Sequence, residues 1–169
     1  MSQSTTQHRG ESPKTVRCAV VTISDTRTIE TDRGGALIVE MLEASGHAVS
    51  SRHIVRDDPA EIEPLVRQLA DRQTTDAVLM TGGTGIAARD RTFETVSGLL
   101  TKAMPGYGEL FRMLSYEDIG PAAMLSRAVG GVLNEVIVLT MPGSVAAVRL
   151  AMEKLIVPEI GHLVYEARK

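Results

Sequence analysis

The chain has 169 residues, a formal net charge of −3 and 43% hydrophobic residues. A length of about 100–200 residues is typical of one domain, and this hydrophobic content is enough to form a buried core. The acidic balance gives no support for a nucleic-acid-binding protein, since such proteins normally carry a basic excess.

The first fifteen residues, MSQSTTQHRGESPKT, are polar and contain no apolar stretch. Their composition predicts a disordered tail over residues 1–15, followed by a single domain over residues 16–169. No apolar run approaches the ~20 residues that span a bilayer, so we expect a cytoplasmic protein without a membrane partner. The one cysteine, Cys18, excludes a disulfide within the chain and is expected to be buried and inert.

The first half of the domain alternates strand and helix patterns. Residues 16–23, VRCAVVTI, have the continuous apolar character of a strand buried on both faces. Residues 33–45 show helical spacing and are followed by Gly46, while residues 47–55 alternate like a strand. Pro59 is expected to begin a helix that reaches about residue 72. Asp57 and Asp58 precede it and are interpreted as helix N-terminal charge.

The second half continues the alternation. Residues 76–81 predict another buried strand, with Asp76 pairing or capping at its start, and helices are expected over 92–102, 107–114 and 121–126. Residues 128–133 and 135–141 predict strands joined by a turn at Asn134, and Ser144 is expected to cap a long final helix. The order predicts an α/β fold, a three-layer α/β/α sandwich around a mostly parallel sheet.

Ligands of open α/β sheets bind beyond the carboxyl ends of the strands. This rule directs attention to three loops, at residues 24–33, 81–94 and 141–146. The second loop, TGGTGIAARDRTFE, has three interpretations. It can be a dinucleotide-binding turn, a phosphate-handling catalytic loop or a tight turn without a ligand.

Gly83, Gly85 and Ala88 match the dinucleotide fingerprint G-x-G-x-x-A, which would suit a nicotinamide-dependent enzyme. The match is weak because the fingerprint needs a second strand about 20 residues further on, where this chain reads PGYGELF. A P-loop is excluded, since no Gly-Lys-Ser or Gly-Lys-Thr occurs. The backbone N–H groups of a glycine turn can nevertheless converge on an anion.

Asp90 directly follows the glycines, and Asp25 follows the first predicted strand. A carboxylate beside a phosphate repels the ligand unless a cation such as Mg²⁺ lies between them. Two carboxylates with a glycine loop therefore favour metal-assisted phosphoryl or nucleotidyl transfer, with Asp25 and Asp90 as possible Mg²⁺ ligands.

Four segments together carry a family resemblance: TISDT, TGGTGIAARDRTFE, PGYGELFRMLSYEDIGPAAMLSRAVGG and MPGS. In this order they resemble the MogA/MoaB family of molybdenum-cofactor biosynthesis proteins, over about residues 17–161 and most strongly the MoaB branch. The same module is similar to the G domain of gephyrin. The resemblance implies a three-layer α/β/α domain that forms homotrimers or homohexamers. It also implies adenylylation of molybdopterin by ATP, with Mg²⁺ as cofactor and pyrophosphate as leaving group.

The resemblance also implies roles for individual residues. Asp90 takes the position of the essential aspartate, and Asp25 the other acidic position at the pocket. Residues implied to bind substrate or its phosphates are Thr81, Gly82, Gly83, Thr84, Gly85, Glu94, Ser126, Arg127, Pro142, Gly143 and Ser144. The chain reads MPGSV where MogA and gephyrin typically read PGNP, so a non-catalytic molybdopterin-binding or scaffold protein of the MoaB type is the alternative.

Overall fold

A computed structural model describes residues 12–71 and 73–169, and within them six strands form one sheet. The strands are β1 (Arg17–Ile23), β2 (Ala48–Val55), β3 (Ala77–Thr81), β4 (Lys102–Ala103), β5 (Gly130–Leu133) and β6 (Val136–Met141). Their order in the sheet is β2-β1-β3-β6-β5-β4. The first four strands of that order run parallel, whereas at one edge β5 pairs antiparallel with β6, and β4 pairs antiparallel with β5. The expected mostly parallel sheet is confirmed.

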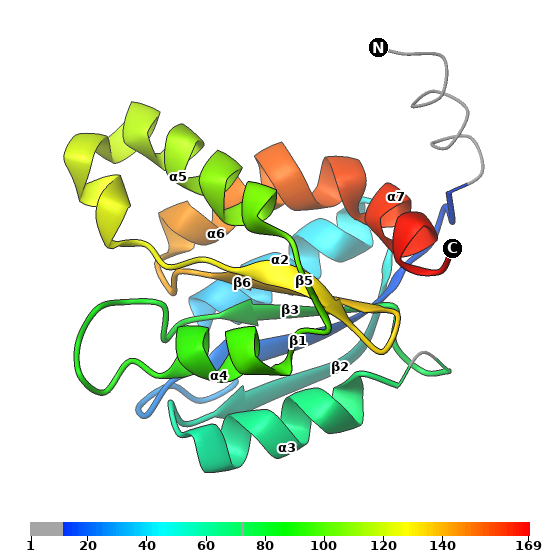
Figure 1. Cartoon of the computed structure of the whole chain (residues 1–169), viewed down its shortest axis with the longest axis horizontal. Helices are drawn as coiled ribbons and strands as arrows, with labels where there is room; N and C mark the ends of the chain where they lie inside the picture. The colour runs from blue at the N-terminus through cyan, green and yellow to red at the C-terminus, as the bar shows by residue number, and fades with distance from the viewer. Residues whose placement is uncertain (1–11, 72) are drawn as a thin grey trace.

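Helices cover both faces of this sheet (Figure 1). One layer contains α3 (Pro59–Leu69) and α4 (Thr92–Leu99), and the other contains α2 (Arg33–Ala44), α5 (Pro105–Ile119), α6 (Val145–Ala151) and α7 (Val157–Ala167). Among the described residues, no helix is long and apolar enough to cross a lipid bilayer.

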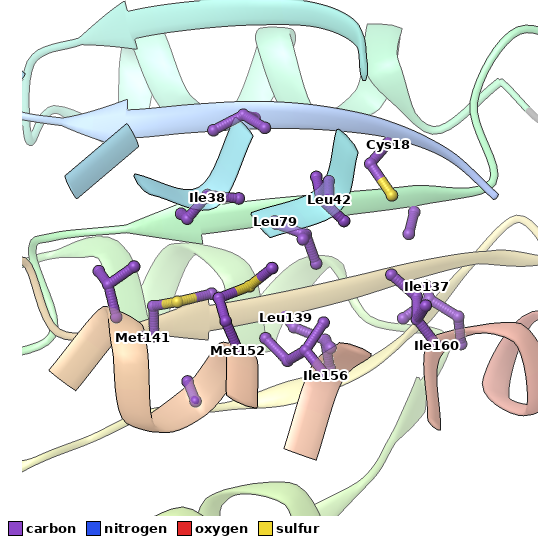
Figure 2. Close-up of a cluster of buried hydrophobic side chains, with 14 of the residues drawn as sticks. Cys18, Ile38, Leu42, Leu79, Ile137, Leu139, Met141, Met152, Ile156 and Ile160 are labelled. Atoms are coloured by element: carbon purple, nitrogen blue, oxygen red, sulfur yellow. The ribbon is translucent and has the colours of Figure 1, made fainter. Parts of the chain in front are cut away.

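Each buried strand supplies side chains to both layers, because successive residues of a strand point to opposite faces. In β1, Val20 belongs to the same buried cluster as residues of α2 and α7, while Val21 belongs to the cluster with residues of α3 and α4. Figure 2 shows the first of these clusters, in which Ile38 and Leu42 of α2 face Leu79 of β3. These continuous apolar strands are what the sequence indicated.

Cys18 lies in the same cluster and is fully buried, as expected (Figure 2). Burial, with a smaller effect of the Asp76 charge, raises the pKa of its thiol to about 12. A thiol with such a pKa is protonated near neutral pH and is a poor nucleophile.

Several predicted helices differ from the structure, and the one expected to reach about residue 72 ends at Leu69. The helix expected to reach residue 102 ends at Leu99, because Lys102 and Ala103 pair with Val132 and Gly131 as β4. The helix expected over residues 107–114 is longer and starts at Pro105, the first-turn position that proline favours. The short helix expected from residue 121 is a 3₁₀ helix, η1 (Gly120–Leu125).

The long final helix is interrupted by a wider π-helical segment, η2 (Met152–Ile156). Pro158 follows within the first turn of α7. Proline has no N–H to donate and its ring collides with the carbonyl one turn earlier, so a local widening of the helix relieves the conflict. The regular hydrophobic spacing gave no sign of this.

Most of the predicted tail, residues 1–11, lies outside the described residues. Its end is described and contacts the domain: the Thr15 hydroxyl donates to the carbonyl of Gly46 at 3.1 Å. The carbonyl of Pro13 lies against Gly161 of α7, with no room for a larger side chain there.

Asp76 pairs at the start of β3, as its position indicated. Its carboxylate accepts hydrogen bonds from the backbone N–H of Arg17 at 2.7 Å and from Nη2 of Arg17 at 2.7 Å. Nη2 of Arg168 donates to it at 2.6 Å. The carboxylate thus ties β1, β3 and the end of α7 together at the amino ends of the strands.

We expect this cluster to govern acid stability. Burial alone would raise the pKa of Asp76, but the hydrogen bonds from Arg17 and Arg168 outweigh burial and lower it from 3.8 to about 2. A lowered carboxyl pKa contributes stability above the unfolded value, and that stability is lost as the pH falls through the folded value. The loss should be about 2 kcal/mol of unfolding free energy between about pH 5 and pH 2.

Denaturant unfolding of wild type and Asp76→Asn over this pH range measures the effect. The variant should lack this part of the pH dependence, and Glu109→Gln, at an exposed position of α5, is the control. Equal losses in wild type and Asp76→Asn would show that the cluster does not set acid stability.

Candidate functional site

The three loops singled out by sequence meet at the carboxyl ends of β1, β3 and β6. The backbone N–H of Gly82 donates to the carbonyl of Met141 at 3.0 Å. The Thr81 hydroxyl donates to the carbonyl of Pro142 at 3.1 Å. From the first loop, Nη2 of Arg27 donates to the carbonyl of Gly143 at 3.3 Å. The predicted edge of the sheet is therefore one connected surface.

A cavity of about 360 Å³, here called the main cavity, opens at this edge. The predicted site residues that line it are Gly83, Thr84, Gly85, Asp90, Ser126, Pro142, Gly143 and Ser144. Its opposite wall is apolar and comes from α5 and η1, including Phe111, Ile119 and Leu125. This wall was not predicted from the sequence, although Phe111 lies within the helix expected over residues 107–114.

A second, smaller cavity of about 180 Å³ adjoins the first and is here called the acidic cavity. Asp25, Asp57 and Asp90 line it together with Arg89, and Gly83 and Asp90 also line the main cavity. The structure thus brings the predicted pair Asp25 and Asp90 to one place. Nη1 of Arg89 lies 4.0 Å from Oδ2 of Asp25.

Asp57 is the third carboxylate of the acidic cavity, and sequence reasoning placed it differently. Only its neighbour Asp58 caps α3, by accepting from the backbone N–H of Ala60 at 2.9 Å. Oδ1 of Asp57 instead accepts from the backbone N–H of Arg91 at 3.2 Å and from the Thr92 hydroxyl at 3.0 Å. The position of Asp57 just after β2 could have placed it at the site, because the carboxyl ends of parallel strands lie at the same edge of a sheet.

The environment of Asp57 disfavours its charged form. Burial has the largest effect and raises the pKa of Asp57, while the hydrogen bonds from Thr92 and Arg91 lower it. The negative charges of Asp90 and Asp25 raise it further. A group of carboxylates that repel one another in this way is a favourable place for a cation.

The glycine loop passes close to its neighbours at two residues with positive φ. Gly82 has φ 104° and a side chain there would meet the carbonyl oxygen of Ile23 at 2.3 Å. Gly83 has φ 64° and a side chain there would reach Oδ2 of Asp57 at 2.6 Å. Only glycine fits both positions, and this brings the loop backbone to the acidic cavity.

The glycines do not stand at the start of a helix, and the helix that follows begins at Thr92, as predicted. Turns and bends separate Gly85 from this helix, α4. The segment PGYGELF lies in α5 and forms no strand. The dinucleotide interpretation needs a helix N-terminus beside the glycines and a ribose-binding strand, so the described fold does not support it.

Asp90 is held in place by its own loop. Its Oδ2 accepts from the backbone N–H of Ala87 at 2.9 Å, and its backbone N–H donates to the carbonyl of Ala87 at 2.9 Å. Asp90 lines both cavities from this position. Ser144 is fixed similarly, because its hydroxyl caps α6 by accepting from the N–H of Ala147 at 3.2 Å.

Glu94 and Arg127 do not line either cavity. Arg127 forms an ion pair with Glu94, and its guanidinium lies 5.1 Å from the ring centre of Phe93. Thr81 and Gly82 also lie behind the cavity surface, where they join β3 to the loop after β6. These four predicted site residues therefore contact the loops and do not face the cavity space.

Oxygen ligands of the acidic cavity suit Mg²⁺, which proteins usually hold by one or two carboxylates together with substrate phosphates. Within residues 12–71 and 73–169, no group of three or more acidic, histidine or cysteine side chains is arranged as a ready metal site. An ion bound here would take only part of its ligands from the protein, with Asp25 and Asp90 as the candidates.

Comparisons with known proteins agree with this architecture. Residues 19–162 match the family model described as "Probable molybdopterin binding domain". A relative from Halalkalibacterium halodurans, "Molybdenum cofactor biosynthesis protein B", is 54% identical over 164 residues, which cover 96% of each chain.

Two solved structures are also similar. A crystal structure of molybdenum cofactor biosynthesis protein B has a TM-score of 0.89 and 55% identity, covering 92% of this chain and 98% of the other. The tungsten cofactor synthesizing protein MoaB from Pyrococcus furiosus has a TM-score of 0.83 and 36% identity, covering 93% and 99%. Both are similar over nearly their whole length.

Proposed function

The chain belongs to the molybdopterin-binding domain family as a MoaB-type protein of molybdenum cofactor biosynthesis, and we propose that it adenylylates molybdopterin. In this reaction AMP passes from Mg-ATP to the terminal phosphate of the pterin, and pyrophosphate is released. The observation that carries the proposal is the acidic cavity, where Asp25, Asp57 and Asp90 meet beside the glycine-lined main cavity.

The two cavities suit different parts of the substrates. The main cavity has an apolar wall from Phe111, Ile119 and Leu125, which suits a flat ring system. Its other side includes the glycine loop and Gly143, whose backbone N–H groups suit phosphate oxygens. The volume of about 360 Å³ is within the range of small-molecule sites.

The chemistry needs positioning more than proton removal. A phosphate oxygen of molybdopterin attacks the α-phosphorus of ATP, the new P–O bond forms, and the bond to the β-phosphate oxygen breaks. The attacking oxygen is already ionised near neutral pH, since the second pKa of a phosphate monoester is about 6. Mg²⁺ held by Asp25 and Asp90 would supply neutralisation of the phosphate charge.

Arg89 is the arginine that lines the acidic cavity. Its side chain is 82% exposed and lies 4.0 Å from Asp25. A guanidinium at this position can pair with the phosphates of the departing pyrophosphate.

Asp57 provides a test that separates charge from structure. Asp57→Asn keeps a side-chain oxygen for the N–H of Arg91 and the Thr92 hydroxyl, so we expect the fold stability to be retained. The variant removes one of the repelling charges, so a higher Mg²⁺ concentration should be needed for half-maximal turnover. Asp57→Ala should in addition lose about 1 kcal/mol of stability, because both hydrogen bonds lose their acceptor.

The Mg²⁺ requirement is measured by following turnover as Mg²⁺ is titrated, and the stability is measured by denaturant unfolding. Both measurements are made on Asp57→Asn and Asp57→Ala, with Asp58→Asn as the control. If Asp57→Asn has the Mg²⁺ requirement of the wild type, then Asp57 acts only as a structural acceptor.

We also propose self-association, as expected for a homotrimer or homohexamer. An apolar face on α5 and η1 supports it, since Met113, Tyr116 and Met124 are 55%, 60% and 73% exposed. Phe111 of α5 does not belong to this face, since it is a core residue with 1% exposure.

The assay of the proposal measures pyrophosphate release from Mg-ATP with and without molybdopterin. Release that depends on the pterin supports the transferase. Pterin binding without pyrophosphate release would instead support the alternative, a non-catalytic molybdopterin-binding or scaffold protein.

A further inference from the structure

The side chain of Arg127 contacts two points of the loop that carries Asp90 and one residue of the following helix, α4. Nε donates to the carbonyl of Gly85 at 2.7 Å, and Nη2 donates to the carbonyl of Asp90 at 3.0 Å. Nη1 forms the ion pair with Glu94. The backbone N–H of Arg127 adds a fourth contact, to the carbonyl of Thr84 at 3.2 Å.

These contacts span a part of the loop that is otherwise held by the hydrogen bonds between Asp90 and Ala87 within the loop itself. The residues between Gly85 and Asp90, from Ile86 to Arg89, are exposed and belong to no helix or strand. Arg127 donates to the carbonyls of Gly85 and Asp90, the residues that flank this segment. Its side chain is 23% exposed and is packed on Phe93, so its own position is restricted.

The geometry points to Arg127 as a positioning residue, which fixes Gly85 and Asp90 and does not bind substrate. Each nitrogen of its guanidinium already donates to the chain, and the residue lies outside the main cavity. Its catalytic consequence rests on the proposed function, because a displaced Asp90 would no longer hold the phosphates in line. The Glu94 carboxylate shares the role by orienting the guanidinium.

The substitution Arg127→Lys distinguishes a role in positioning the loop from a role in binding phosphate. A lysine ammonium is a compact charge that binds phosphate well. It cannot reach three acceptors with the planar fork that arginine presents. Arg127→Lys should therefore resemble Arg127→Met if Arg127 positions the loop, and should resemble the wild type if Arg127 binds a phosphate.

The test is amide hydrogen exchange of residues 82–92, measured with turnover and molybdopterin affinity, in Arg127→Lys and Arg127→Met. We expect exchange in this segment to be about tenfold faster in both variants, since local opening costs less free energy. Turnover should fall by about 10²-fold, as for a misplacement of about 1 Å, while affinity for molybdopterin changes little.

Arg67→Met is the matched control, because Arg67 also donates two nitrogens to a glutamate, Glu63, but on the exposed surface of α3. Glu94→Gln keeps an acceptor without the charge and should give an intermediate increase in exchange, even if Arg127→Met fails to fold. Wild-type exchange in Arg127→Lys would overturn the inference, as would loss of pterin affinity with unchanged exchange. An inactive wild type would refute the transferase alone, since the exchange result still tests the positioning role.

Discussion

Asp90→Ala should lose at least about 10²-fold in turnover while the purified protein keeps its affinity for molybdopterin. Asp90 lines both cavities, and its carboxylate is oriented by the N–H of Ala87. Removing it eliminates one of the two proposed Mg²⁺ ligands but leaves the apolar wall of the main cavity unchanged. Turnover and pterin binding should therefore respond differently.

Asp90→Asn separates the charge from the loop geometry, since an amide oxygen can still accept from Ala87. It should lose turnover nearly as strongly as Asp90→Ala. Asp118→Ala, an exposed position of α5, changes the net charge equally and should remain active. A fully active Asp90→Asn would mean that the negative charge at this position has no part in the reaction.

Gly82→Ala should destabilise the protein by about 3 kcal/mol or more. The residue has φ 104°, which a side chain strains, and the added carbon would lie 2.3 Å from the backbone carbonyl oxygen of Ile23. That oxygen belongs to the last residue of β1, a strand paired with β2 and β3 on its two sides, and cannot move away as a flexible side chain could. Relief requires displacement of the loop itself, so activity should fall together with stability.

Gly98 provides the matched control. It lies in α4 with no atom within 4 Å of an added side-chain carbon. Gly98→Ala should therefore stabilise the protein by about 0.5–1 kcal/mol, because alanine favours the helix. Denaturant unfolding of Gly82→Ala and Gly98→Ala measures both changes in the free energy of unfolding. A Gly82→Ala variant as stable as the wild type would show that the loop is not held against β1.

Much of this fold could be predicted because its strands are buried on both faces. The apolar runs at residues 16–23 and 76–81 become β1 and β3 almost residue for residue. The edge strand β4 was missed, since Lys102 and Ala103 are exposed and carry no strand pattern. Only the pairing with β5, distant in the chain, makes them a strand.

The site was predictable to the extent that it follows the ends of parallel strands. Asp25 and Asp90 were placed together by this rule, whereas Asp57 was assigned to the adjacent helix because Asp58-Pro59 offered a simpler explanation. The apolar wall of the main cavity depends on how α5 packs over the sheet, which local pattern does not encode. Arg127 is adjacent to the site residue Ser126, and only the contacts show that it turns toward the loop.

The proposed transfer of AMP is tested most directly with isotopically labelled ATP in the presence of molybdopterin and Mg²⁺. With ATP labelled at the α-phosphate, the wild type should transfer the label to the pterin. With ATP labelled at the γ-phosphate, the label should leave as pyrophosphate. Transfer of the γ-label, or no transfer of either label by a folded protein that binds the pterin, would contradict the account.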